Sequence, residues 1–103
     1  MALIRSTLKD AGAIVDVQAY GGNGTITVSD MIGKKFTLVC VNLSVAPTVT
    51  HNGTTINADV SYPNQYHDGA NTWNVYQYEG DITTNADTFT CNSTAIWYVI
   101  ITD

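Results

Sequence analysis

Short runs in which apolar and polar residues alternate recur along this chain, and turn-forming residues separate them. Val15, Val17 and Ala19, for example, fall on one face of an extended segment, because successive side chains of a strand point to opposite faces. No stretch shows the apolar spacing of an amphipathic helix. Helix-favouring residues are also scarce, with one Glu and three Lys, so the pattern predicts an all-β chain.

Six segments combine alternation or a continuous apolar run with the β-branched and aromatic residues that favour strands. They are residues 15–20, 26–29, 36–43, 72–79, 87–92 and 95–102. Segments 36–43 and 95–102 are apolar on both faces, which predicts strands that are covered on both sides. Residues 62–71 are rich in Pro, Asn, Asp and Gly, so we expect a loop there.

The pair Asn52-Gly53 is the clearest local signal in the chain. Both residue types tolerate positive φ, so the pair favours a two-residue type I′ turn. We therefore expect a hairpin in which His51 faces Thr54 and Val49 faces Ile56. Eight or nine strands at this spacing predict an antiparallel β-sandwich, of jelly-roll-like or another sandwich topology, with a small barrel as the alternative.

A length of 103 residues predicts a single domain over 1–103. Residues 9–12 separate the apolar residues 2–8 from the first alternating run, which sets off 1–12 as an N-terminal segment. We expect this segment, which contains Leu3 and Ile4, to be either an edge strand of the sandwich or an arm that pairs with a neighbouring subunit.

The charge of the chain excludes one class of partner. Its formal net charge is −5, with 4 Lys and Arg, so we expect no nucleic-acid binding, which needs a basic patch. The longest apolar run, 95–101, is too short for membrane insertion. Arg5 interrupts the apolar N-terminus, so we expect no signal peptide and a protein that stays in the cytoplasm unless it leaves by lysis.

No catalytic motif is present, and we expect no enzyme activity and no cofactor. His51 and His67 are expected to be exposed turn histidines rather than metal ligands, because no clustered ligand spacing accompanies them. Asp81 and Asp87 are expected to be ordinary polar turn residues, with a calcium loop as the alternative. Cys40 and Cys91 are expected to be buried thiols, with a disulfide as the alternative.

An aromatic segment is the best candidate for binding. It contains Tyr62, Tyr66, Trp73, Tyr76 and Tyr78, and His67 lies among them. Tyr and Trp give a large contact area at low entropic cost, which suits a subunit interface or stacking on sugars. The alternative is that Trp73 and Val75 face the core while Tyr76 and Tyr78 lie on the outer face. Together with Leu3 and Ile4, the aromatic segment makes up the predicted contact surface.

Asp87, Phe89 and Cys91 lie at alternate positions of a late predicted strand, and Cys40 lies in an earlier one. This pattern resembles the immunoglobulin family, in which an Asp-x-x-x-Tyr-x-Cys-like run marks a late strand whose Cys pairs with one on an early strand. Phe89 stands where that family has Tyr, and no Trp follows Cys40 at the family's spacing. The resemblance implies a sandwich and not membership of the family.

The overall character of the chain resembles the small all-β accessory proteins of tailed-phage virions. It opens with Met, lacks an export signal, is acidic, and is rich in Thr, Asn and Gly. The resemblance implies a non-enzymatic virion protein (a capsid decoration protein, head fibre or tail module) that assembles in the host bacterial cytoplasm. Its implied partners are phage capsid or tail proteins, further copies of itself as a homo-oligomer, and a host glycan. The alternative function is a carbohydrate-binding module in which Tyr66, Trp73 and Tyr76 stack on sugars.

Overall fold

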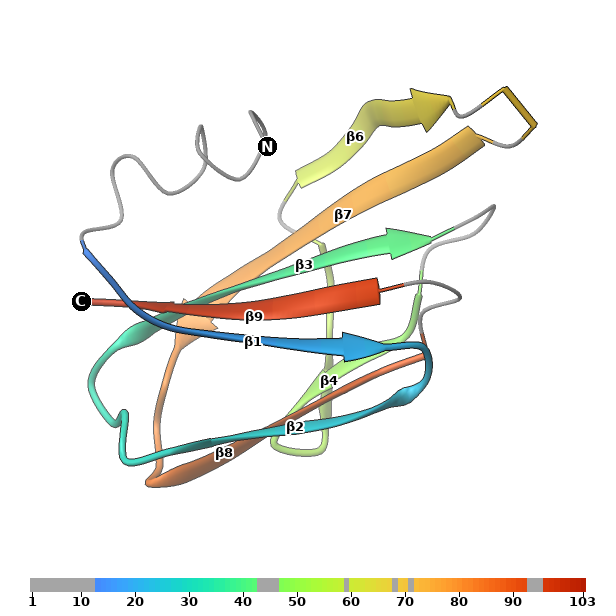
Figure 1. Cartoon of the computed structure of the whole chain (residues 1–103). Coiled ribbons are helices and arrows are strands. Elements are labelled where there is room, and N and C mark those ends of the chain that lie inside the picture. The colour runs from blue at the N-terminus through green and yellow to red at the C-terminus, as the bar shows by residue number, and fades with distance from the viewer. Residues whose placement is uncertain (1–12, 43–46, 59, 68, 71, 93–95) are drawn as a thin grey trace.

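A computed structural model describes residues 13–42, 47–58, 60–67, 69–70, 72–92 and 96–103. These residues form nine strands in two antiparallel sheets that pack face to face as a sandwich (Figure 1). The five-stranded sheet runs β1 (Ile14–Gly21), β9 (Ile96–Thr102), β3 (Lys35–Asn42), β7 (Thr72–Asp81) and β6 (Val60–His67). The four-stranded sheet runs β2 (Gly24–Ser29), β8 (Ala86–Cys91), β4 (Val49–His51) and β5 (Thr54–Ile56). The predicted all-β sandwich is confirmed, and the two sheets do not close into a barrel.

The core lies between the two sheets, and β3 supplies its centre. Phe36, Leu38 and Cys40 point from β3 into this core. Val39 is buried on the opposite face of β3, beside Ile100 of β9. The prediction that these two strands are covered on both sides is therefore confirmed. The remaining buried residues of the inter-sheet core are Ile26, Val28, Val49, Tyr78, Ile82, Phe89, Cys91, Trp97, Val99 and Ile101.

The β4–β5 hairpin forms with the predicted register. His51 pairs with Thr54, and Val49 pairs with Ile56. Asn52 and Gly53 have φ values of 52° and 83°, as a type I′ turn requires at both central positions. The turn chemistry of two adjacent residues was sufficient to fix the pairing of both strands.

The prediction of a loop over residues 62–71 is wrong for 62–67, whereas 69–70 lie outside any strand, as expected. Residues 60–67 form strand β6, which pairs with β7 at the edge of the five-stranded sheet. The pairing is irregular between Ser61 and Gln65, and Pro63 lies within this irregularity. Proline lacks a backbone N–H and is tolerated in edge strands and at bulges, so its presence did not exclude a strand here.

The faces of β7 are opposite to those of the alternative in which Trp73 and Val75 face the core. Tyr78 is buried in the inter-sheet core, and Tyr76 packs against that core. Val75 packs instead against Val39 and Ile100 on the outer face. The period of two shows which side chains share a face, but it does not show which face turns inward.

Candidate functional site

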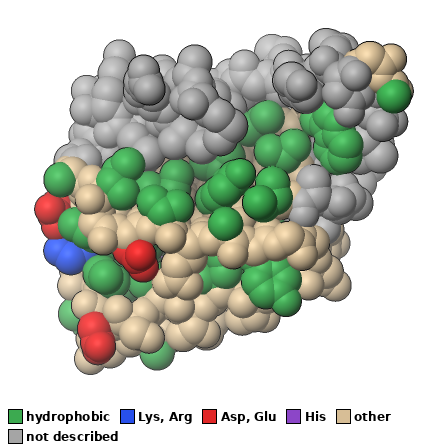
Figure 2. All heavy atoms as spheres, in the orientation of Figure 1, with side chains coloured by type: hydrophobic (Ala, Val, Ile, Leu, Met, Phe, Trp, Pro, Cys, Tyr) green, Lys and Arg blue, Asp and Glu red, His purple; other side chains and the backbone are tan. Residues whose placement is uncertain are grey.

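Strand β1 is the most unusual surface in the described part of the chain. It lies at the end of the five-stranded sheet and pairs with β9 along one side. Its large apolar side chains are well exposed: Ile14 is 54% exposed, Val17 52% and Tyr20 41%. Hydrophobic side chains form a row across the middle of the molecule, where β1 runs (Figure 2). An edge strand with exposed apolar residues is a template for pairing with another chain.

The alternation of β1 is inverted relative to an ordinary edge strand. Val17 and Ala19 lie opposite Ile100 and Tyr98, whose side chains are on the face away from the inter-sheet core. The polar residues Asp16 and Gln18 share the inward face, because they lie opposite the core residues Ile101 and Val99. In most half-exposed strands the polar side chains face water and the apolar ones face the core.

The inward polar residues of β1 hold it against the other sheet. Gln18 Nε2 donates to Asp16 Oδ2 at 3.2 Å and to the carbonyl oxygen of Thr27 on β2 at 3.4 Å. The apolar side chains cannot reach the core without turning these polar groups out. The exposed apolar face of β1 is therefore a consequence of the contacts that its polar face makes with β2.

The β1–β2 turn is held by aromatic packing. Trp97 Nε1 donates a hydrogen bond of 2.9 Å to the carbonyl oxygen of Gly22. The Tyr20 ring lies 6.1 Å from the Trp97 ring, between centroids, and against Gly24. A Cβ at position 24 would fall 2.1 Å from a carbon of the Tyr20 ring, so a side chain there would force this ring to move. These contacts fix the end of β1 and keep its apolar face in one position.

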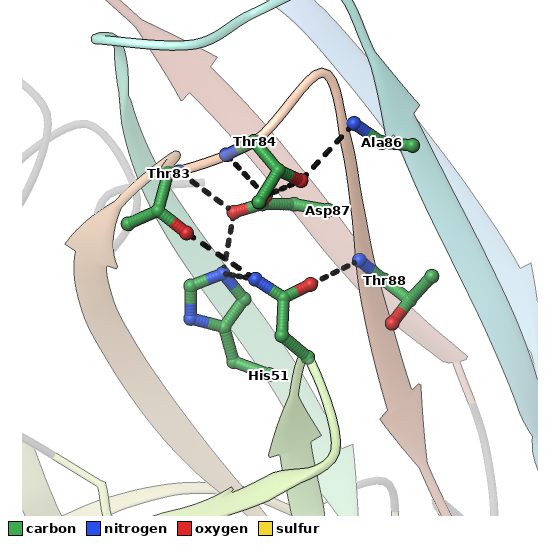
Figure 3. A network of polar contacts seen from close by, with 7 residues as sticks. His51, Thr83, Thr84, Ala86, Asp87 and Thr88 are labelled. Carbon is green, nitrogen blue, oxygen red and sulfur yellow. Dashed lines mark hydrogen bonds and ion pairs between the residues drawn. The ribbon is translucent and has the colours of Figure 1, made fainter.

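A polar cluster lies at the end of the four-stranded sheet that is remote from the β1–β2 turn, and it is the other candidate for a functional site (Figure 3). We call it the clasp, and it consists of His51, Asn52, Thr83, Thr84, Asp87 and Thr88. The Asp87 carboxylate is buried and accepts four hydrogen bonds. His51 Nε2 lies 2.6 Å from Oδ2, and the backbone N–H of Thr83 donates to the same oxygen at 3.0 Å. The backbone N–H and the hydroxyl of Thr84 donate to Oδ1 at 2.8 and 2.5 Å.

Asn52 extends the clasp to the β4–β5 turn. Its side-chain Oδ1 accepts from the N–H of Thr88 at 2.9 Å, and its own N–H donates to the carbonyl of Thr88 at 2.8 Å. Its Nδ2 lies 3.4 Å from both His51 Nε2 and Thr83 Oγ1. The clasp thus ties the β7–β8 turn to the β4–β5 hairpin, two segments that are distant in sequence.

The electrostatics of the clasp favour a structural role. Burial by itself raises the pKa of Asp87, but the hydrogen bonds from Thr84, His51, Thr83 and Asn52 outweigh it. The pKa of Asp87 therefore lies well below its usual range, and the carboxylate stays ionised. Both oxygens are already occupied by donors, which leaves little capacity to accept a substrate proton or a metal ion.

The prediction that His51 is an exposed turn histidine is wrong. Its side chain is 15% exposed, and its ring stacks on Phe89 with a centroid distance of 4.7 Å and an interplanar angle of 6°. Phe36 packs against both rings at 4.8 Å. His51 lies directly opposite Phe89 in the β4–β8 pairing. This long-range pairing places the His51 ring against the core.

Asp81 and Asp87 do not form a common acidic loop. Asp81 is exposed at the end of β7, where its Oδ1 lies 3.1 Å from Lys35 Nζ. Asp87 points inward from β8, so its predicted place as a turn residue is wrong. Within the described residues, no group of three or more His, Cys, Asp or Glu side chains is placed to hold a metal ion.

The predicted aromatic surface is only partly described. Tyr62, Tyr66 and His67 lie on β6, but their side chains are outside the described set, as are Leu3 and Ile4 with the whole of segment 1–12. Trp73 is half-buried on β7. Tyr76 packs against the core and Tyr78 is buried within it. The surface of β1 was missed, although the exposed apolar side chains belong to the very alternation that identified the strand.

Comparison with protein-family models, with curated proteins and with solved structures finds no match to this chain. Within the described residues, no helix has the length and hydrophobicity to cross a membrane.

Proposed function

We propose that this protein is a non-enzymatic structural protein that assembles through protein–protein contacts. The exposed apolar face of edge strand β1 carries the proposal. Ile14, Val15 and Val17 are each more than two-fifths exposed, on a strand whose position is fixed by its inward polar contacts. Such a strand gains stability when another chain covers it, because both apolar burial and backbone pairing become available.

The partner in this proposal is a second copy of the same chain. Strand pairing between identical edges builds symmetric dimers at low cost, since each copy supplies the same row of backbone donors and acceptors. Asp16 is turned inward and bonded to Gln18, so like charges do not meet directly across a β1–β1 contact. The absence of exposed Lys along β1 removes the most common protection of an edge.

The place of this assembly is proposed to be a tailed-phage virion, as a capsid decoration protein, head fibre or tail module. The acidic, Thr- and Asn-rich composition and the β-sandwich are the features that support this placement. In a virion the protein would dock on capsid or tail proteins and stabilise the particle or present loops to a host glycan. The saturated clasp supports a non-enzymatic role, because the buried His–carboxylate pair is already engaged in holding two turns together.

The test is the molar mass of the untagged protein by size-exclusion chromatography with light scattering. We expect the wild type at a multiple of 11.1 kDa and Val17→Lys at the monomer mass, because a lysine on this face opposes strand pairing. Ile32→Lys is the matched control: Ile32 is 58% exposed but lies in the β2–β3 turn. This variant should keep the wild-type mass.

Two results would overturn the proposed assembly. One is a wild type that stays monomeric at every concentration, and the other is an equal loss of mass in both lysine variants. A monomer that binds sugars and loses this binding on Trp73→Ala would instead establish the carbohydrate-binding module.

A further inference from the structure

Two cysteines from opposite sheets meet at the centre of the core. Cys40 lies on β3 of the five-stranded sheet and Cys91 on β8 of the four-stranded sheet. Their Sγ atoms are 3.5 Å apart, although the residues are separated by 51 positions in sequence. Both side chains are buried, at 0% and 1% exposure. The sandwich therefore holds two thiols in contact.

Neither cysteine can move away from the other without disrupting a sheet. Strand β3 is paired on both sides, and Cys40 lies opposite Tyr76 on β7 and Trp97 on β9. Strand β8 is also paired on both sides, and Cys91 lies opposite Gly24 on β2 and Val49 on β4. Central strands are the most firmly held parts of a sheet, so the contact between the thiols is a fixed feature of the fold.

The two sulfur atoms need to move only a short distance to form a disulfide. A disulfide has a sulfur–sulfur length of about 2.05 Å, so the two atoms must approach by roughly 1.5 Å. Closing this distance requires rotation of the two side chains and a slight approach of the sheets. Tyr78 lies beside the pair, and the pKa of its hydroxyl is raised well above the usual range. The main cause is burial, and the neighbouring Cys40 and Cys91 add to it. The thiols therefore lie in apolar surroundings.

We propose that Cys40 and Cys91 are a modification site that closes to an inter-sheet disulfide when the chain folds in the presence of a small-molecule disulfide. One cysteine thiolate attacks the oxidant, forms a mixed disulfide and releases one small thiol. The second cysteine thiolate then attacks the protein sulfur of that mixed disulfide and releases the other small thiol. The two protons lost by the cysteines end on the two released thiols, and the small disulfide is the species reduced.

Burial determines when this reaction takes place. In the folded protein both thiols are shielded from an oxidant in solution, so exchange requires an open chain. The bond is formed during folding, as the packing of β3 against β8 brings the second thiol to the mixed disulfide. Once formed, it is equally shielded from reductants. The inference is independent of the proposed assembly, because it concerns the interior of one copy.

The test is refolding of the full chain from denaturant in oxidised and reduced glutathione, compared with refolding in excess reductant. Each product is denatured, alkylated at its thiols and weighed by mass spectrometry. We expect the oxidised product to carry no alkyl group, to run as a monomer on a non-reducing denaturing gel and to be two hydrogen atoms lighter than the unalkylated dithiol chain, whereas the reduced product should carry two alkyl groups. Its unfolding midpoint should be higher by about 10 °C or more, because the cross-link closes a long loop in the unfolded chain.

Single variants supply the matched control. Cys40→Ala and Cys91→Ala each retain one thiol, so neither can close a disulfide within the chain. Each should carry one alkyl group or one glutathione, and neither should gain the higher midpoint in the oxidising buffer. If either variant fails to fold, the alkylation of the refolded wild type still decides the question. The proposal fails if the wild type folds in the glutathione buffer with both thiols still open to alkylation, or if the only disulfide formed joins two chains.

Discussion

The clasp and the surface of β1 differ in which kind of side chain turns inward. In the clasp, polar groups turn inward, and the Asp87 carboxylate accepts four hydrogen bonds while almost no solvent reaches it. On β1, apolar side chains turn outward, and Ile14 and Val17 are more than half exposed. Each region reverses the usual rule that polar groups face water and apolar groups face the core.

The two reversals have different consequences. A buried carboxylate is tolerated when its oxygens are fully bonded, and it then stabilises the segments that supply the donors. Exposed apolar side chains, in contrast, are not buried by their own chain, so their burial would have to come from a partner. We therefore expect the clasp to stabilise the monomer, and in our proposal β1 serves assembly. Substitutions in the two regions should separate these two properties.

The largest effect should come from Asp87→Ala. The change leaves the donors of His51, Thr83 and Thr84 without an acceptor, so we expect a loss of about 3 kcal/mol in the free energy of unfolding. Urea unfolding followed by tryptophan fluorescence measures it. Asp81→Ala is the control, because it removes an exposed carboxylate that pairs with Lys35, and it should cost less than about 1 kcal/mol. Equal costs for the two variants would contradict the structural role of the clasp.

Acid should weaken the clasp without any substitution. The pKa of Asp87 is lower in the folded chain than in the unfolded one, so the unfolded chain takes up this proton first as the pH falls. The stabilisation is complete above the ordinary Asp pKa of about 3.9 and is lost as the pH falls toward the folded value.

The variant Asp87→Asn isolates this contribution from that of the other carboxylates. Its stability should be lower than that of the wild type at pH 7, and the difference should narrow below about pH 4. Urea unfolding at a series of pH values measures the two curves. A difference that stays constant down to pH 2 would mean that Asp87 has the same pKa in the folded and the unfolded chain, which would contradict the role of the clasp in lowering it.

The smallest effect on stability should come from Val17→Lys, the substitution that we expect to affect assembly most. Val17 is exposed and its replacement opens no cavity, so the free energy of unfolding of the monomer should change by less than about 0.5 kcal/mol. The measurement is made at a concentration where the wild type is also monomeric. A loss of several kcal/mol would show that Val17 packs within its own chain, and β1 would no longer be a surface reserved for a partner.

Several elements could be predicted because their signals are local. The Asn52-Gly53 turn fixed the register of β4 and β5, and the doubly apolar segments identified β3 and β9 as strands covered on both faces. Strand β6 was missed because Pro63 and its polar neighbours suggest a loop, while its pairing with β7 is a tertiary contact. The clasp was missed because His51 and Asp87 are 36 residues apart and neither lies in a recognisable motif.

The sequence by itself determined the all-β class, the positions of most strands and the turn of one hairpin, since period and turn chemistry act over a few neighbouring residues. Only the tertiary structure decided which face of β1 and β7 turns inward, because both faces of each strand were chemically admissible. It also decided that Cys40 meets Cys91 and that His51 meets Asp87. These contacts depend on how strands from distant parts of the chain pair and stack, and no local pattern specifies that arrangement.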